Sequence, residues 1–172
     1  GLMAVIEAIA TTYLEADAAS VTFSGIPSTY EHLQLRLNAS TSYNNTSAPS
    51  YIRVRFNGDS GANYSFHRMT ANNTSIAGAG ATGQAQGSVT GPANLSPAAN
   101  FGGMVYDILD YANTNKNTTM AGVAGSGTSA PVVGFNSVLW DSTAALTTIL
   151  LTSSSGDWRR GSEFTLYGLN SA

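Results

Sequence analysis

The chain has 172 residues, which is enough for one domain with a buried core, and 42% of them are hydrophobic. Only 10% are charged and the net charge is -3, so the composition excludes a disordered chain and offers no basic surface for nucleic acid. There is no Cys, which rules out disulfides and thiolate metal sites, and no apolar run approaches the ~20 residues that a membrane-spanning helix needs.

The amino-terminal stretch 5–14 fits either a helix or a strand. Its Thr11, Thr12 and Tyr13 favour the strand, because β-branched and aromatic residues suit a pleated surface. Residues 1–14 are apolar enough either to form a first core strand or to insert into a neighbouring subunit. The stretch lacks the basic start and long apolar core of a signal peptide, so we expect assembly in the cytoplasm of a host cell.

Alternating apolar and polar residues follow. In 32–39 Leu33, Leu35 and Leu37 alternate with polar residues, and 51–58 repeats the pattern with Ile52, Val54 and Phe56. Such alternation is typical of half-buried strands in an antiparallel sheet. Further strand candidates lie at 20–26, 63–69, 103–111, 131–140, 145–153 and 162–169.

Turn sequences such as GIPST, NGDSG and SSSGD separate these strands. Eight or nine strands with almost no helix predict an all-β fold, an antiparallel β-sandwich of the jelly-roll kind, in a single domain spanning 1–172. The predicted core consists of large side chains on the inward faces of these strands: Leu33, Leu35, Leu37, Ile52, Val54, Phe56, Phe66, Ile108, Trp140, Ile149, Phe164 and Leu166.

Residues 70–102 interrupt the strand pattern, because they are rich in Gly, Ala and Asn and hold few large apolar side chains. Only GQAQGSV (83–89) could form a short strand. A connection of this length is unusual inside a compact domain. We expect either a surface loop or a segment that a neighbouring subunit orders, and the second alternative predicts a homotrimer.

The segment NGDSGANYSFHRM (57–69) concentrates side chains used in hydrolytic chemistry: Asp59, Ser60, Ser65, His67 and Arg68. In a strand, His67 faces away from the apolar residues beside it, and no sharp strand-to-helix turn presents a nucleophile nearby. Asp59 falls in the preceding turn, where Asp commonly bonds to its own backbone. We therefore predict no catalytic residues here and a protein that is not an enzyme.

The same turn could offer oxygen ligands to calcium from Asn57, Asp59, Ser60 and Asn63. Calcium usually takes several carboxylates, and this turn has one. Two histidines without cysteine disfavour zinc. We predict no metal site and no cofactor, and leave calcium near Asp59 open.

Asp107 and Asp110 could form a pair of carboxylates for acid–base chemistry. Three positions apart on a strand, however, they face opposite sides of the sheet. We expect one to face solvent and the other to pair with an arginine across strands, with Arg36, Arg53 and Arg55 as candidates.

The turn GDWRRGS (156–162) places a tryptophan beside two arginines. Trp and Arg dominate interface hot spots, and a Trp ring can also stack on a sugar. Trp158, Arg159 and Arg160 are therefore candidate contacts for a protein partner or a glycan. The alternative is that Trp158 folds back onto the end of the sandwich.

Four blocks of sequence, in this order, together resemble a family of small virion structural proteins of tailed bacteriophages: SVTFSGIPSTYEHLQLRL, IRVRFNGDSGANYSFHRM, YDILDYANTNKNTTM and VLWDSTAALTTILLTSSSGDWRRGSEFTLYGL. The resemblance covers most of the chain, and the main regions that it does not cover are 70–102 and 120–131. It implies a β-sandwich that is commonly oligomeric and often trimeric in virions, and it carries no catalytic residues. Where the family has a basic or glycine-led stretch after YANTNK, this chain has NTTMAGVAGSG.

Two functions follow for a protein that is not an enzyme. The first is a capsid decoration or cement protein that forms trimers on the major capsid shell. The second is a tail-fibre, tail-tip or head-fibre component that binds host surface glycans. Expected partners are copies of the chain itself, the major capsid protein or other virion proteins, and in the second case a host glycan; neither nucleic acid nor a membrane is expected. An enzyme such as a depolymerase is the least favoured alternative.

Overall fold

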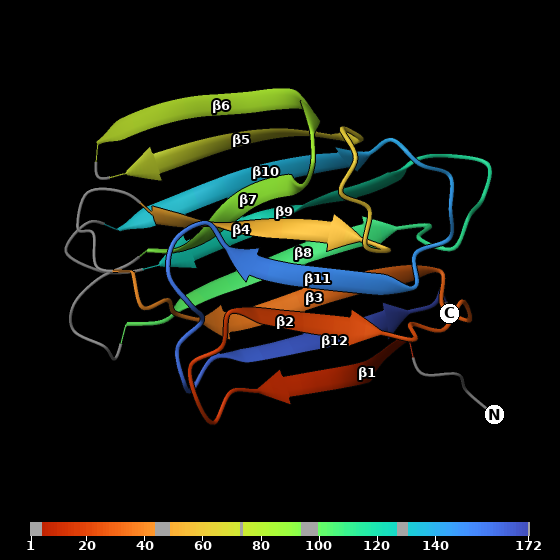
Figure 1. Ribbon diagram of the computed structural model, residues 1–172, viewed down its shortest axis with the longest axis horizontal. Helices are drawn as coiled ribbons and strands as arrows, with labels where there is room; N and C mark the ends of the chain where they lie inside the picture. The colour runs from red at the N-terminus through yellow and green to blue at the C-terminus, as the bar shows by residue number, and fades with distance from the viewer. Residues whose placement is uncertain (1–4, 44–48, 73, 94–99, 127–130, 172) are drawn as a thin grey trace.

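The computed structural model describes residues 5–43, 49–72, 74–93, 100–126 and 131–171. Two antiparallel sheets of unequal width lie face to face, and the described residues contain no helix (Figure 1). The wide sheet has the order β1 (Ile6–Tyr13), β12 (Glu163–Leu169), β3 (His32–Ala39), β8 (Gly102–Leu109), β9 (Thr118–Ser126), β10 (Val132–Trp140), β5 (Tyr64–Asn72) and β6 (Ser75–Gln84). The narrow sheet has the order β2 (Ser20–Ser24), β11 (Thr148–Ser153), β4 (Pro49–Phe56) and β7 (Gly87–Ala93). The predicted antiparallel β-sandwich is thus confirmed.

The core lies between the two sheets and follows the alternation in the sequence. In β3 the alternate residues Leu33, Leu35, Leu37 and Ala39 are buried, and in β4 Ile52, Val54 and Phe56 are buried in the same way. Every predicted core side chain is buried except Phe66, which packs against the core while remaining half-buried. Burial of these side chains supplies the main driving force for folding, at about 25 cal/mol per Å² of apolar surface removed from water.

The amino-terminal strand is confirmed, but it is not a core strand. β1 pairs with β12 at one edge of the wide sheet, and most of its side chains are exposed. The alternative in which residues 1–14 insert into a neighbouring subunit includes residues 1–4, which lie outside the described residues.

The expectation of a long irregular connection at 70–102 is wrong for most of that segment. Residues 75–84 form β6 at the other edge of the wide sheet, and β7 begins within the suggested short strand and completes the narrow sheet. β7 is ordered within the subunit, because Val89 and Thr90 are buried between the sheets. Small residues therefore form strands here without supplying the large side chains that a periodicity search detects.

β9 is a second strand that the sequence pattern does not indicate. It is the centre of a three-stranded meander and pairs with both β8 and β10. Its Gly122 lies directly opposite Tyr106, and a Cβ at Gly122 would come within 2.0 Å of the backbone oxygen of Val105. A glycine is therefore required where the neighbouring strand and its tyrosine ring lie this close.

Candidate functional site

The polar segment at 57–69 is a tight turn followed by the first part of β5, and it carries the chain from β4 of the narrow sheet to β5 of the wide sheet. Asn57 and Gly58 have φ values of 51° and 70°, the left-handed conformation that an Asn-Gly hairpin turn requires. The backbone N–H of Asp59 donates to the Phe56 carbonyl at 2.9 Å. The predicted tight turn is confirmed.

Asp59 serves this turn as a hydrogen-bond acceptor. Its carboxylate accepts from the Trp140 indole N–H at 2.7 Å, from the Asn63 side-chain amide at 2.9 Å and from the Gly61 backbone N–H at 2.8 Å. The Trp140 hydrogen bond first, then those from Asn63 and Gly61, hold the pKa of Asp59 below its usual value. A calcium ion at this position would have to displace these donors.

His67 lies on the outer face of the wide sheet, as the strand alternation predicts. Its ring covers Gly80 of β6, where a Cβ would come within 2.4 Å of it. Ser137 of β10 is directly opposite His67, yet neither side chain forms a hydrogen bond with the described part of the chain. The absence of a catalytic site at His67 stays a prediction.

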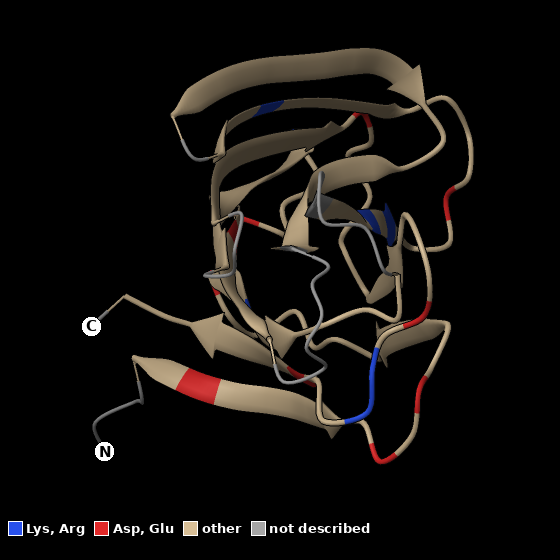
Figure 2. Ribbon diagram, turned by 90° about the vertical axis from the view of Figure 1, so that its left-hand side faces the viewer, with Lys and Arg blue, Asp and Glu red and all other residues tan. Residues whose placement is uncertain are grey.

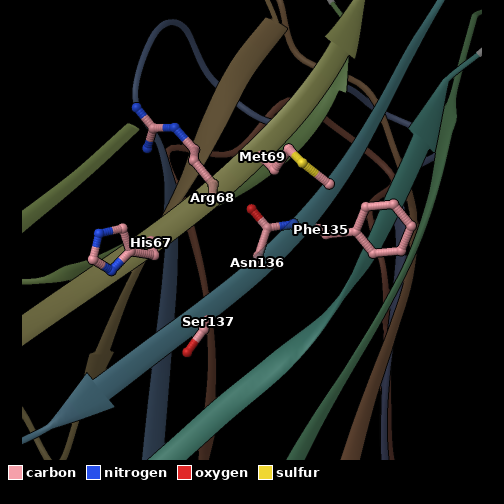
Figure 3. Close-up of a pocket in the computed structure, with 6 residues that line it drawn as sticks. All are labelled: His67, Arg68, Met69, Phe135, Asn136 and Ser137. Atoms are coloured by element: carbon pink, nitrogen blue, oxygen red, sulfur yellow. The ribbon is translucent and has the colours of Figure 1, made fainter. Parts of the chain in front are cut away.

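A shallow depression of about 390 Å³ lies beside His67, between β5 and β10. Figure 3 shows His67 and Ser137 at one end of it and Met69 and Phe135 at the other, while Arg68 points away from this face. The lining is predominantly apolar. In the described residues, no group of three or more His, Cys, Asp or Glu is placed to hold a metal ion, here or elsewhere.

Asp107 does not pair directly with an arginine, so that expectation is wrong. It accepts a hydrogen bond from the Gln34 amide at 2.8 Å, and the amide oxygen of Gln34 accepts from Arg36 at 2.6 Å. Gln34 is directly opposite Asp107 in the register, so it takes the position that the arginine was expected to fill.

Asp110 lies beyond the end of β8 in the left-handed conformation, with φ of 50°. Its carboxylate pairs with the Lys116 ammonium, and the His32 ring lies 3.8 Å away. The hydrogen bond from Lys116 and its charge hold the pKa of Asp110 below its usual value. The two aspartates therefore belong to separate surface networks and do not form a carboxylate pair.

Trp158 is fully buried, so its predicted role as an exposed contact for a partner or glycan is wrong. Its exposed fraction is 0%, its ring packs edge-on against Phe164 at 5.1 Å, and its indole N–H donates to the Leu151 carbonyl at 3.3 Å. The alternative, in which the turn folds back onto the sandwich, is the one observed. Arg159 is half-buried and Arg160 is exposed, in a turn whose own tryptophan is buried.

The outer face of the narrow sheet carries a group of arginines that the sequence reasoning did not assign to a site. Arg53 and Arg55 project outward from β4, on the same face as Tyr51. The Arg68 guanidinium stacks on the Tyr51 ring with 3.7 Å between the guanidinium carbon and the ring centre, and it donates to the Ser88 hydroxyl at 2.8 Å. The alternation in YIRVRF gives the first two arginines, but only the fold brings Arg68 to them.

The outer face of the wide sheet carries an apolar stripe, defined by Val105, Val123, Phe135 and Met69. These side chains stand directly opposite one another on the adjacent strands β8, β9, β10 and β5. Phe135 is 56% exposed and Met69 50%. A continuous exposed apolar surface of this kind is typical of an interaction site.

Comparisons with known proteins give little further information. No family model matches the chain, and no curated protein matches it. The structure is similar to the CBM2 module of evolved Dit from Lactobacillus casei BL23 phage J-1, with 11% identity over 89% of this chain and 69% of that chain. The TM-score is 0.26, which supports neither a shared fold nor a shared function. The described residues include no helix that could cross a membrane.

Proposed function

We propose that the chain is a structural protein of a tailed-phage virion without enzymatic activity, that it forms a homotrimer, and that it decorates the major capsid shell. The four sequence blocks support the virion assignment, and a β-sandwich is the fold that their resemblance implies. The observation that carries the proposal is the unprotected edge strand β6, because it supports association through the wide sheet.

Sheet edges in soluble proteins usually carry a feature that prevents pairing with another chain. β1 has a bulge between Ala8 and Ala10 and carries Glu7, and β2 is only five residues long. β7 is covered, because it packs against strands of the wide sheet and most of its residues are buried. Three of the four edges are therefore protected.

β6 has none of these features along most of its length. Its ten residues include no charged residue and no proline, and nearly all of them are exposed. From Ser75 to Ala81 it pairs with β5, and the one irregularity lies toward its end. Figure 1 shows β5 and β6 extending past the narrow sheet, and none of the described residues covers this edge.

The apolar stripe leads to the same edge. Met69, at its end, is directly opposite Gly78 of β6, and Ile76 on β6 is 73% exposed. A neighbouring subunit along β6 would pair the free backbone groups and cover both side chains, and the open space at Gly78 permits close approach. In a ring of three subunits this contact is heterologous, so the free backbone groups of β6 bond to side chains or loops on a different surface of the next subunit. Pairing of two β6 edges would instead give a two-fold dimer, and a dimeric mass would contradict the trimer.

The test combines solution mass with copy number in purified particles. Light scattering should give three times the 17.8 kDa subunit mass, and quantitative mass spectrometry should give hundreds of copies per particle. A few to some tens of copies would reject decoration in favour of a tail or fibre component. A monomeric mass would contradict the trimer, and absence from particles would contradict the virion assignment.

A further inference from the structure

We propose that the outer face of the narrow sheet binds an acidic polysaccharide through the guanidinium groups of Arg53, Arg55 and Arg68. This face belongs to the narrow sheet, whereas β6 and the apolar stripe belong to the wide sheet. The inference rests on the charge and geometry of this face and does not depend on the virion assignment.

Arg53 and Arg55 set the spacing of the site. They are two residues apart on β4, so they share a face with their Cβ atoms about 7 Å apart. Arg53 is exposed, and its side chain forms no hydrogen bond or ion pair with the described part of the chain. Arg55 is half-buried and donates from Nε to the Ala85 carbonyl at 3.3 Å, which leaves its terminal nitrogens available.

Arg68 reaches this face from the wide sheet and is held there. The Tyr51 ring supports its guanidinium on one side, and Ser88 accepts one of its five N–H donors. Its Nε is buried without a partner among the described residues. Ser88 is directly opposite Arg53, so the third guanidinium lies beside the first. An arginine fixed by stacking loses less freedom when it binds a ligand than a mobile one does.

No carboxylate of the described residues forms an ion pair with these three arginines. The strands of the narrow sheet contain no Asp or Glu, and the ion pairs formed within the described residues involve other groups. Figure 2 shows the acidic residues, in red, mostly in the connecting loops. The chain is acidic overall, yet this face gathers three of its seven basic residues, which makes it a local site of positive charge.

The neighbouring side chains indicate the class of ligand. Hydroxyls of Ser20 and Thr152 lie in the same cross-strand row as Arg53, and Thr22 lies in the row of Arg55. Arginine binds carboxylate and sulfate groups with paired hydrogen bonds, and the hydroxyls can bond to sugar hydroxyls. A nucleic acid would need a longer basic track than three residues on a chain of net charge -3. An acidic polysaccharide fits the site better.

The test measures binding of polygalacturonate, dextran sulfate, neutral dextran and a single-stranded DNA oligonucleotide by calorimetry at low and high salt. We expect the protein to bind one or both acidic polysaccharides, more weakly as salt rises, and to leave neutral dextran unbound. Polygalacturonate and dextran sulfate separate carboxylate recognition from sulfate recognition. The double variant Arg53→Gln and Arg55→Gln should lower the affinity at least about tenfold, because it removes charge-assisted hydrogen bonds.

The matched control is the double variant Arg36→Gln and Lys116→Gln, which removes the same charge from β3 of the wide sheet and from the connection between β8 and β9, both outside this face. It should leave the affinity within about threefold, because more distant charges are largely screened. Circular dichroism should show that both variants remain folded. Equal losses in the two double variants, comparable binding of neutral dextran, tighter binding of DNA, or no binding of either acidic polymer would overturn the proposal.

Discussion

Asp59 ties the turn between β4 and β5 to the end of β10, through its hydrogen bonds to Gly61, Asn63 and Trp140. We expect Asp59→Asn to lower the free energy of unfolding by about 1–3 kcal/mol, because an amide cannot accept all three hydrogen bonds. Urea denaturation at pH 7 measures this. Asp157→Asn is the control: it makes the same charge change at an exposed residue, and it should have little effect.

The lowered pKa of Asp59 also predicts how stability depends on pH. The carboxylate is easier to ionise in the folded state, so its contribution is present above the unfolded pKa of about 3.9 and is lost as pH falls through the lower folded pKa. Asp59→Asn should therefore lose less stability than the wild type between about pH 5 and pH 2. Identical acid unfolding curves would show that the carboxylate contributes nothing to the fold.

Trp158 contributes to stability through burial. Trp158→Ala should lower the free energy of unfolding by about 3–5 kcal/mol, because it leaves a cavity against Phe164 and removes the hydrogen bond to Leu151. Trp158→Phe should cost less, and Arg160→Ala should stay within about 0.5 kcal/mol. Chemical denaturation compares the three. Unchanged stability of Trp158→Ala would contradict the buried position.

Two glycines of β9 should respond differently to replacement by alanine, because Gly122 lies against β8 and Gly125 faces open space. Gly122→Ala should destabilise the fold by about 1–3 kcal/mol, because its methyl group would press on the backbone of β8. Gly125→Ala in the same strand meets nothing within 4 Å and should be neutral or stabilising by about 0.5–1 kcal/mol. Thermal unfolding of both variants checks the difference in sign.

Small residues of this kind explain why the three strands β6, β7 and β9 are difficult to predict from the sequence. Alternation predicts β3 and β4 because each outward polar residue follows a large inward one. In β6 and β9 many of these positions hold Gly or Ala, which pack at close approach or stay exposed and so leave no period of two in hydrophobicity. β7 is short and includes Gly91 and Pro92, both of which resemble a turn signal.

β6 provides the prediction about assembly. Ile76→Lys removes the most exposed apolar side chain of this edge and adds a charge, which opposes pairing with a neighbour. We expect the light-scattering mass to fall from trimer toward monomer at equal protein concentration. Thr22→Lys adds the same charge on the narrow sheet and should leave the mass unchanged. A full trimer in Ile76→Lys would show that β6 is not the contact.

Across the whole chain, the sequence predicts the class of fold, and all but one of the core side chains that it nominates are buried, because burial of apolar residues on alternating strands decides both. The core also holds large side chains that the sequence does not nominate, among them Tyr106, Tyr111 and Trp158. It does not predict the surfaces, because these depend on which strands become neighbours. The apolar stripe joins residues from four strands, and Arg68 meets Tyr51 only because β5 lies beside the narrow sheet. Trp158 shows the same dependence on the fold, because the local sequence GDWRRGS is compatible with an exposed tryptophan as well as with the buried one that is observed.

The edge strand β6 belongs to the wide sheet, whereas the face that carries Arg53 and Arg55 belongs to the narrow sheet. Trimer formation through β6 should therefore leave the affinity of one subunit for a short soluble ligand unchanged, and it should strengthen binding to a surface that several subunits contact at once. Subunits of a closed ring are related by rotation, and each therefore presents the outer face of its narrow sheet at the same angle to the three-fold axis.

On a surface coated with polygalacturonate, the trimer should be retained about 10²–10⁴ times more strongly than a monomer. Ile76→Lys should lose this advantage while its affinity for a short soluble oligogalacturonate stays unchanged. The Arg53→Gln and Arg55→Gln variant should lose both while remaining a trimer. Biolayer interferometry and calorimetry measure the two quantities, and a fall in the soluble affinity of Ile76→Lys would show that the two surfaces are coupled.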